Sequence, residues 1–180
     1  SDLRKHGVDT SHIVRGPGRV GIYFLEVGAN QRPSKVVYDR EGSSIAKTCR
    51  GVIDWGRTFS GAGWFHVTGI TPALSECAAA VTLEAVQAAR AAGVTVSCDL
   101  NYRKNLWKWG QPPAKVMGEL AREVDIVIAN EEDIQMALGI AAPVDVHSSS
   151  LDPACYESLT NTVLQKYPNL KVIAVTMRES

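Results

Sequence analysis

From residue 64 onward, short apolar runs alternate with segments whose apolar residues recur at helical spacing. The apolar runs predict strands at residues 64–68, 94–98, 125–129 and 171–175. The other segments predict helices over 71–92, from residue 113, over 131–138 and from 152 to about 167. Elements that alternate in this way connect by right-handed crossovers into a parallel sheet. We therefore predict an α/β fold with helices on both faces of the sheet.

The chain up to about residue 40 has a different pattern, without helical spacing. β-branched and aromatic residues predict strands at 19–27 and 35–39, with turn-forming residues between them. Polar residues are mixed into both strands, so we expect an antiparallel pair with one face outside the core. We divide the chain into a β region at 11–45 and an α/β core at 46–180. Both ends suggest a larger fold, because nothing covers the last predicted strand and no strand precedes the first turn.

Composition argues against several classes of function. Lys plus Arg and Asp plus Glu each number 19, so no basic field attracts nucleic acid or an anionic membrane. No apolar run approaches the roughly 20 residues that a membrane-spanning helix needs. Cys49, Cys77, Cys98 and Cys155 are scattered, which predicts reduced thiols rather than a zinc site or a disulfide framework. Together these features favour a cytoplasmic protein.

Polar side chains follow each predicted strand of the parallel sheet. They lie at residues 69–71, 99–107, 130–133 and 176–178. Ligands of open parallel sheets bind outside the carboxyl ends of the strands. We therefore expect a pocket at this rim, which is the strongest inference that position alone allows.

Asp99, Asn101 and Arg103 alternate after the second of these strands. On an extended segment they would share one face, and an Arg guanidinium matches a carboxylate or a phosphate with two hydrogen bonds. The alternative is an ion pair between Asp99 and Arg103 with no ligand. Residues 130–133 present a similar choice. Their acidic side chains either stabilise a helix N-terminus or organise the water shell of Mg²⁺ beside phosphates.

Two other features are weaker. Residues 16–21 fit the G-x-G-x-x-G pattern of dinucleotide-binding proteins, but a strand follows them where that motif needs a helix. His66 lies within a predicted strand and is expected to be a buried core residue.

Several motifs resemble those of the ribokinase-like (phosphofructokinase B type) carbohydrate kinases, and in particular the 2-keto-3-deoxygluconate kinases. The D-x-N-Y-R-x-x-L-W motif at 99–107 and the G-I-T-P-A-L-S motif at 69–75 are specific to that group. Shorter similarities cover the turn before the lid, the lid strands and the N-x-x-E motif, at residues 7–10, 21–24, 37–44 and 130–133. The resemblance extends over essentially the whole chain. It implies a three-layer α/β/α fold, partial in this chain, with a small antiparallel β lid.

The resemblance also implies phosphorylation of a sugar hydroxyl by ATP with Mg²⁺. The implied substrate-binding residues are Tyr23, Tyr38, Arg40, Asp99, Asn101 and Arg103, with Arg103 on the keto-acid carboxylate. The implied nucleotide-binding residues are Asn130, Thr176 and Arg178, and Asp133 would act on Mg²⁺ indirectly, through water. The lids of the family often pair between subunits, which suggests a homodimer.

This sequence departs from the family pattern at several places. Asp133 stands where the family has Glu, and Leu25 where some relatives have an Arg for the carboxylate. The C-terminal G-A-G-D segment, which supplies the catalytic base, and an N-terminal glycine pair are missing. We therefore expect no catalytic residue in this chain and no turnover by it alone. Leu25 keeps open a kinase of a neutral sugar such as fructose, and the missing base keeps open a non-catalytic sugar- or nucleotide-binding fragment.

Overall fold

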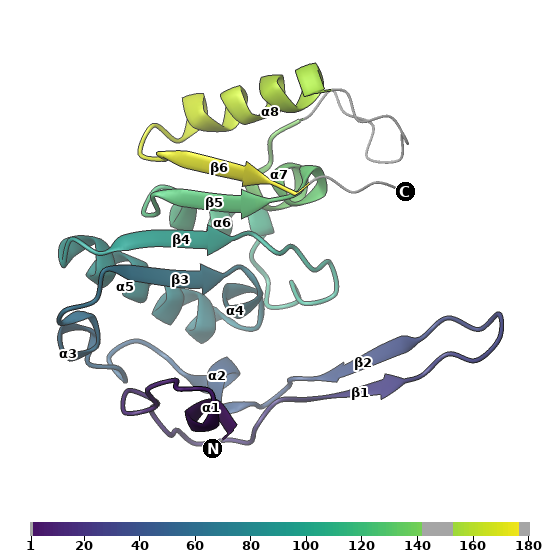
Figure 1. The fold of residues 1–180 in the computed structure, drawn as a ribbon, viewed down its shortest axis with the longest axis vertical. Helices are drawn as coiled ribbons and strands as arrows, with labels where there is room; N and C mark the ends of the chain where they lie inside the picture. The colour runs from purple at the N-terminus through teal and green to yellow at the C-terminus, as the bar shows by residue number, and fades with distance from the viewer. Residues whose placement is uncertain (1, 142–152, 177–180) are drawn as a thin grey trace.

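A computed structural model describes residues 2–141 and 153–176 of the chain. Six strands and eight helices follow one another in these residues (Figure 1). In chain order they are α1 (Asp2–Lys5), β1 (Ile22–Glu26), β2 (Lys35–Asp39), α2 (Ser44–Lys47), α3 (Trp55–Phe59), β3 (Trp64–Thr68), α4 (Ile70–Ala73), α5 (Glu76–Ala91), β4 (Thr95–Asp99), α6 (Pro113–Ala121), β5 (Ile126–Ala129), α7 (Glu131–Leu138), α8 (Pro153–Lys166) and β6 (Val172–Val175). None of these helices is long and apolar enough to cross a membrane.

The four later strands form one parallel sheet in the order β3-β4-β5-β6 (Figure 1). Phe65 pairs with Val96, Cys98 with Val127, and Val127 with Ile173. Sequential strands are thus neighbours throughout, as the alternating pattern predicts. The predicted parallel sheet is confirmed.

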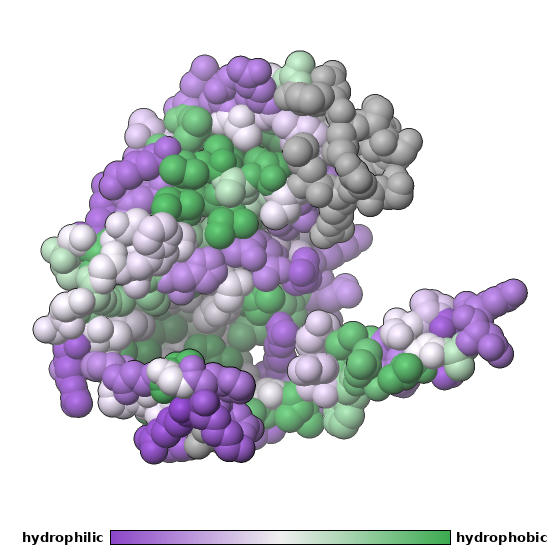
Figure 2. Space-filling view, viewed as in Figure 1, coloured by the Kyte–Doolittle hydropathy of each residue, from purple (hydrophilic) through white to green (hydrophobic). Residues whose placement is uncertain are grey.

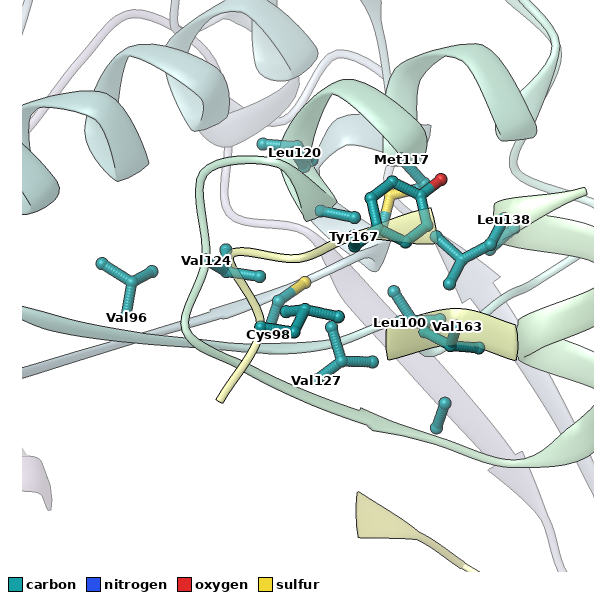
Figure 3. Packing of buried hydrophobic residues seen from close by; sticks show 14 of the residues in the cluster. Val96, Cys98, Leu100, Met117, Leu120, Val124, Val127, Leu138, Val163 and Tyr167 are labelled. Carbon is teal, nitrogen blue, oxygen red and sulfur yellow. The ribbon is translucent and has the colours of Figure 1, made fainter. Parts of the chain in front are cut away.

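One face of the sheet carries the hydrophobic core. Cys98 and Val127 on the strands pack with Met117 of α6 and with Val163 of α8 (Figure 3). Tyr167, directly after α8, is buried in the same cluster and is only 1% exposed. Residues of α5, α6, α7 and α8 all contribute to this single cluster, so these helices cover the same face.

The opposite face of the sheet is open in the described part of the chain. Trp64 is 59% exposed and Val172 is 49% exposed, although both lie on strands. Figure 2 shows apolar atoms over β5 and β6 on this face. His66, expected to be buried, is exposed here, with its Nδ1 2.8 Å from the Ser97 hydroxyl. The expected helices on both faces are therefore seen on one face only, within residues 2–141 and 153–176.

The helix predicted over 71–92 is divided. A single turn, α4, is followed by Ser75 in an extended conformation, and its hydroxyl accepts a hydrogen bond from the Ala78 N–H at 3.0 Å. This N-cap starts α5 at Glu76, because the Ser side chain satisfies a helix N–H that would otherwise lack a partner. The predicted start at Thr71 was therefore five residues too early.

Strands β1 and β2 form the predicted antiparallel ribbon, which extends away from the sheet (Figure 1). Tyr23 pairs with Tyr38, and their side chains are 66% and 58% exposed. At the base of the ribbon, the Arg19 guanidinium contacts the Asp39 carboxylate and donates to the Glu41 carbonyl at 2.7 Å. We call residues 19–43 the lid.

The cysteine prediction was wrong for two of the four residues. Cys49 and Cys77 form a disulfide, with their Cα atoms 4.4 Å apart. The pairing could not be inferred from sequence, because 28 positions separate the two residues. They meet only because the segment that follows the lid packs against the start of α5. Cys98 is buried, as expected for a core thiol.

Candidate functional site at the sheet rim and lid

The parallel register brings the polar residues that follow the strands to one rim. Thr68 at the end of β3 pairs with Asp99 at the end of β4, and Asp99 pairs with Ile128 of β5. The Thr176 N–H donates to the Ala129 carbonyl at 2.8 Å, which places Thr176 beside the end of β5. The polar residues that follow the strands therefore lie together at one edge of the sheet, as the sequence predicts.

Gly69 follows β3 at a point where the backbones of two strands come very close. Its N–H donates to the Asp99 carbonyl at 2.7 Å. A Cβ atom built on Gly69 would lie 2.9 Å from the Met117 Cε atom and would overlap the Leu100 carbonyl. Only glycine leaves room for this approach, and the approach fixes the start of α4 against the rim.

The loop at residues 99–103 leaves β4 in a turn rather than as an extended segment. Asn101 has a φ of 40°, in the left-handed region, and its N–H donates to the Asp99 carboxylate at 3.1 Å. Asn is one of the few residues that adopt this conformation readily. The predicted two-residue alternation was therefore wrong, since Asp99 and Asn101 are used in the turn while Arg103 extends into solvent.

Arg103 is also not paired with Asp99. Among the residues that the structure describes, no ion pair joins the two, so the alternative of a closed loop ion pair is not supported. Within residues 2–141 and 153–176, the one acceptor of the Arg103 guanidinium is the Tyr102 carbonyl, at 3.0 Å. It is thus available to a ligand.

Asp133, in the first turn of α7, holds the loop after β4. Its carboxylate accepts hydrogen bonds from the Tyr102 N–H at 2.8 Å and the Asn130 N–H at 3.2 Å. The Asn130 side chain in turn accepts from the Asp133 N–H at 2.7 Å, which completes a capping box at the start of α7. Asp133 is 5% exposed, and this burial raises its pKa, against the opposing effect of the two N–H donors.

A cavity of about 220 Å³ lies between the lid and the loop after β4. Its walls carry Tyr38 and Arg40 from the lid and Arg103 from the loop, together with Ile70, Lys104, Asn105 and Leu106. The Arg40 guanidinium lies over the Tyr38 ring, 4.5 Å from the ring centroid. This contact holds the Arg40 side chain against the lid surface.

A second cavity, of about 320 Å³, adjoins the first. Arg40 and Ile70 line both, and Tyr23 of β1 and Thr71 of α4 line the second. The Tyr23 and Tyr38 rings are 6.1 Å apart. The structure thus brings together four of the six predicted substrate-binding residues: Tyr23, Tyr38, Arg40 and Arg103.

The first cavity is positively charged. Arg40, Arg103 and Lys104 line it, and no acidic residue of the described part of the chain does. Within the described residues, none of these three cations lies within the 4.0 Å of a carboxylate that defines an ion pair. Cations gathered without counter-charges favour an anionic ligand, and Arg103 can hold a carboxylate through two hydrogen bonds.

Of the other predicted site residues, those that the structure describes do not line these cavities. Asp99 and Asn101 shape the loop, and the Asn130 side chain is occupied as the N-cap of α7. Thr176 lies at the rim, 2.8 Å from the Ala129 carbonyl through its N–H, and Arg178 lies outside the described residues. The binding roles of these residues remain predictions.

The donor set at the rim suits only an indirect role toward Mg²⁺. In residues 2–141 and 153–176, no group of three His, Cys, Asp or Glu side chains is arranged to hold a metal ion. Both Asp133 oxygens already accept backbone N–H groups, and little of the carboxylate is exposed. An ion beside phosphates would therefore reach Asp133 through water, which Mg²⁺ commonly retains in proteins.

Sequence reasoning missed part of the cavity wall. Lys104, Asn105 and Ile70 line the first cavity although none was singled out. The position of Lys104 directly after Arg103 was a usable signal, since two adjacent cations in a rim loop add to one field. Leu25 is exposed on β1 and lines neither cavity.

The parallel sheet and the antiparallel lid over its rim define a ribokinase-like protein. A solved structure of 2-dehydro-3-deoxygluconokinase from Thermotoga maritima is similar to this chain, with a TM-score of 0.85 and 46% sequence identity. The similarity covers 99% of this chain and 52% of that one. The sequence model of the pfkB family carbohydrate kinases matches residues 1–176. The chain belongs to this family.

Two curated relatives carry related names. A 2-dehydro-3-deoxygalactonokinase from Haloferax volcanii is 34% identical over 153 residues, which are 84% of this chain and 47% of that protein. A 2-dehydro-3-deoxygluconokinase from Bacillus subtilis is 36% identical over 110 residues, which are 59% of this chain and 33% of that protein. The chain thus spans about half, or less, of the length of the curated relatives it matches.

Proposed function

We propose that the protein to which this chain belongs phosphorylates 2-keto-3-deoxygluconate with ATP, as a 2-dehydro-3-deoxygluconokinase. The observation that carries the proposal is the cavity between the lid and the rim. Arg40, Arg103 and Lys104 lie on its wall, and none of the other described residues that line it is acidic. A sugar acid brings the carboxylate that such a cavity needs, and the names of the relatives agree with this substrate class.

The charged and aromatic side chains of the two cavities have distinct parts in the proposed binding. Arg103 holds the substrate carboxylate through its two-pronged guanidinium, and Lys104 adds positive charge. Tyr23 and Tyr38 cover the sugar from the lid side and exclude water. Arg40, held over the Tyr38 ring at 4.5 Å, links the two adjoining cavities.

The nucleotide would lie farther along the rim, near Asn130 and Thr176. Mg²⁺, where bound, neutralises charge on the phosphates during transfer. In this proposal Asp133 orients the waters of the ion and fixes Tyr102 through the hydrogen bond at 2.8 Å. Phosphoryl transfer depends mostly on positioning and on charge stabilisation, and these residues supply both.

A substrate panel tests the proposal. The intact protein would be incubated with ATP and either 2-keto-3-deoxygluconate, its galacto epimer, fructose or ribose, and ADP release would be followed by a coupled assay. We expect the highest kcat/KM for one of the two keto-acids, with the gluco epimer preferred. A preference for a neutral sugar would overturn the substrate, and no turnover with any of the four would overturn the proposed activity.

A kinase of a neutral sugar is the second candidate, and Leu25 favours it. The family resemblance implies an Arg at this strand position in some members, whereas here an uncharged side chain lies outside both cavities. The substrate panel separates the two candidates.

We also propose that two copies of the protein pair through their lids. Ile22, Phe24 and Leu25 on β1 and Val36 and Val37 on β2 are large apolar residues that are exposed. An exposed ribbon of this kind favours association. Analytical ultracentrifugation would detect the dimer, and Phe24→Asp should shift it toward the monomer. A wild-type protein that stays monomeric at high micromolar concentration would contradict the proposal.

A further inference from the structure

The disulfide between Cys49 and Cys77 lies at the root of the lid. Helix α2 follows the lid directly, and Cys49 comes two residues after the end of α2. Cys77 is in the first turn of α5, a helix whose Val86 and Ala89 belong to the core. The bond therefore joins the segment that carries the lid to a fixed element of the core.

Several hydrogen bonds support the same junction. The Ser75 hydroxyl donates to the Ala46 carbonyl at 2.6 Å, and the Glu84 carboxylate accepts from the Gly51 N–H at 3.1 Å and from the Trp55 ring N–H at 3.0 Å. Strands β1 and β2 pair with each other, and their ribbon extends away from the sheet (Figure 1). The angle of the lid thus depends on contacts at its root, and one of these contacts is covalent.

We propose that Cys49 and Cys77 form a reversible thiol–disulfide exchange site, which reacts with low-molecular-weight disulfides and thiols and fixes the root of the lid when oxidised. In the oxidation, the Cys77 thiolate attacks one sulfur of the small disulfide and displaces one small thiolate. The Cys49 thiolate then attacks the Cys77 sulfur of this mixed disulfide and displaces the second. The protein loses two thiol protons and two electrons, and the small disulfide becomes two thiols.

The surroundings of the sulfurs suit this reaction. Cys49 and Cys77 are both partly exposed, so a small molecule can reach them. The positive end of α5 favours negative charge on the Cys77 sulfur. Cys98, in contrast, is buried, and burial raises the pKa of its thiol to about 12, with a smaller contribution from the Asp99 charge. Cys98 therefore has almost no thiolate at neutral pH and does not compete.

The oxidised and reduced states have different consequences for the sugar site. Ile45 of α2 lines the second cavity together with Tyr23 and Arg40. The tether ends just beyond this helix, so its removal loosens one wall of the cavity as well as the lid. In the cytoplasmic location that we propose, thiols are normally kept reduced and disulfides are usually transient. Oxidation would then be the signal that immobilises the lid.

The experiment compares the chain after treatment with oxidised glutathione and after treatment with dithiothreitol. Mass spectrometry after alkylation counts the thiols and locates the disulfide, and hydrogen exchange measures the opening of residues 44–53. We expect a disulfide at Cys49–Cys77 in the oxidised sample. We expect exchange in 44–53 to be at least threefold faster in the reduced sample, with no change in β4 and β5.

Two variants serve as controls, and neither readout requires kinase activity. The double variant Cys49→Ser/Cys77→Ser should match the reduced wild type and should not respond to oxidant, whereas Cys155→Ser should respond as the wild type does. If the double variant does not fold, the two treatments of the wild type decide the question. Failure of oxidised glutathione to form the Cys49–Cys77 bond would overturn the exchange site, and equal exchange rates in the two states would overturn the tether.

Discussion

The carboxylate of Asp133 accepts a hydrogen bond from the backbone N–H of Tyr102 at 2.8 Å, which joins the start of α7 to the loop after β4. Tyr102 immediately precedes Arg103, whose side chain lines the charged cavity. The loop therefore takes its position from a residue in the first turn of α7, the helix that follows the neighbouring strand β5. The acidic helix start of α7 serves both as a cap and as a brace for the proposed carboxylate site.

Replacing Asp133 with Asn should destabilise the fold and disturb this loop. The amide keeps one oxygen acceptor but presents an NH₂ group to one of two backbone N–H donors, those of Asn130 and Tyr102. We expect the free energy of unfolding, measured with urea, to fall by about 1–3 kcal/mol. Glu132→Gln, on the exposed side of the same turn, is the matched control and should have no effect. An Asp133→Asn protein as stable as wild type would refute the bracing role.

Replacing Gly69 with Ala should destabilise the fold more than the addition of a single methyl group suggests. The added methyl group would overlap the Leu100 carbonyl, which is backbone and cannot move aside cheaply. We expect the free energy of unfolding to fall by about 3 kcal/mol or more, because the ends of β3 and β4 must separate. Gly63→Ala is the control, since a Cβ there meets nothing within 4 Å. Thermal unfolding of the two variants distinguishes them, and similar melting temperatures would contradict the close approach.

Asp125 should make the stability depend on pH in the acid range. Burial alone would raise its pKa, but the Lys171 ammonium at 2.8 Å and the Val96 N–H at 2.9 Å lower it on balance. A lowered pKa means that this carboxylate stabilises the fold above its ordinary value of 3.8, and that the stabilisation is lost as the pH falls through the lower value. The Lys171 side chain is largely exposed, so we expect only about 1 kcal/mol.

The check is a comparison of wild type with Asp125→Asn in urea unfolding between pH 7 and pH 2. The wild type should be more stable at neutral pH, and the difference should shrink as the carboxylate becomes protonated. Since other acids titrate in both proteins, only the difference reports on Asp125. A difference that stays constant down to the lowest pH would contradict the assignment.

The parallel sheet was predictable from sequence because each strand is a short apolar run between helical segments. The division of the helix at Ser75 was not, because Leu74 and Ala78 fit one continuous helical spacing on both sides of the break. The left-handed Asn101 was missed for a similar reason. Alternation of Asp99, Asn101 and Arg103 is a valid strand pattern, and only the turn at the end of β4 overrides it.

The candidate site was predictable in part. The location of the site at the rim is predictable, because ligands of parallel sheets bind outside the carboxyl ends of the strands. Arg103 is predictable as a binding residue because it lies in the segment that follows β4. The meeting of Arg40 with Arg103 depends on how the lid lies over the loop, which local sequence does not encode. The disulfide was missed for the same reason, since Cys49 and Cys77 meet only through tertiary packing.

The most direct measurement is a calorimetric titration of 2-keto-3-deoxygluconate into the wild type, Arg103→Ala and Arg57→Ala, where Arg57 is an exposed arginine of α3 remote in sequence from the cavity residues. We predict that Arg103→Ala weakens binding by at least tenfold, because a carboxylate loses a two-pronged partner. Arg57→Ala should bind as the wild type does. Wild type that binds fructose more tightly than the keto-acid, or equal affinities in Arg103→Ala and wild type, would contradict a sugar-acid site at this rim.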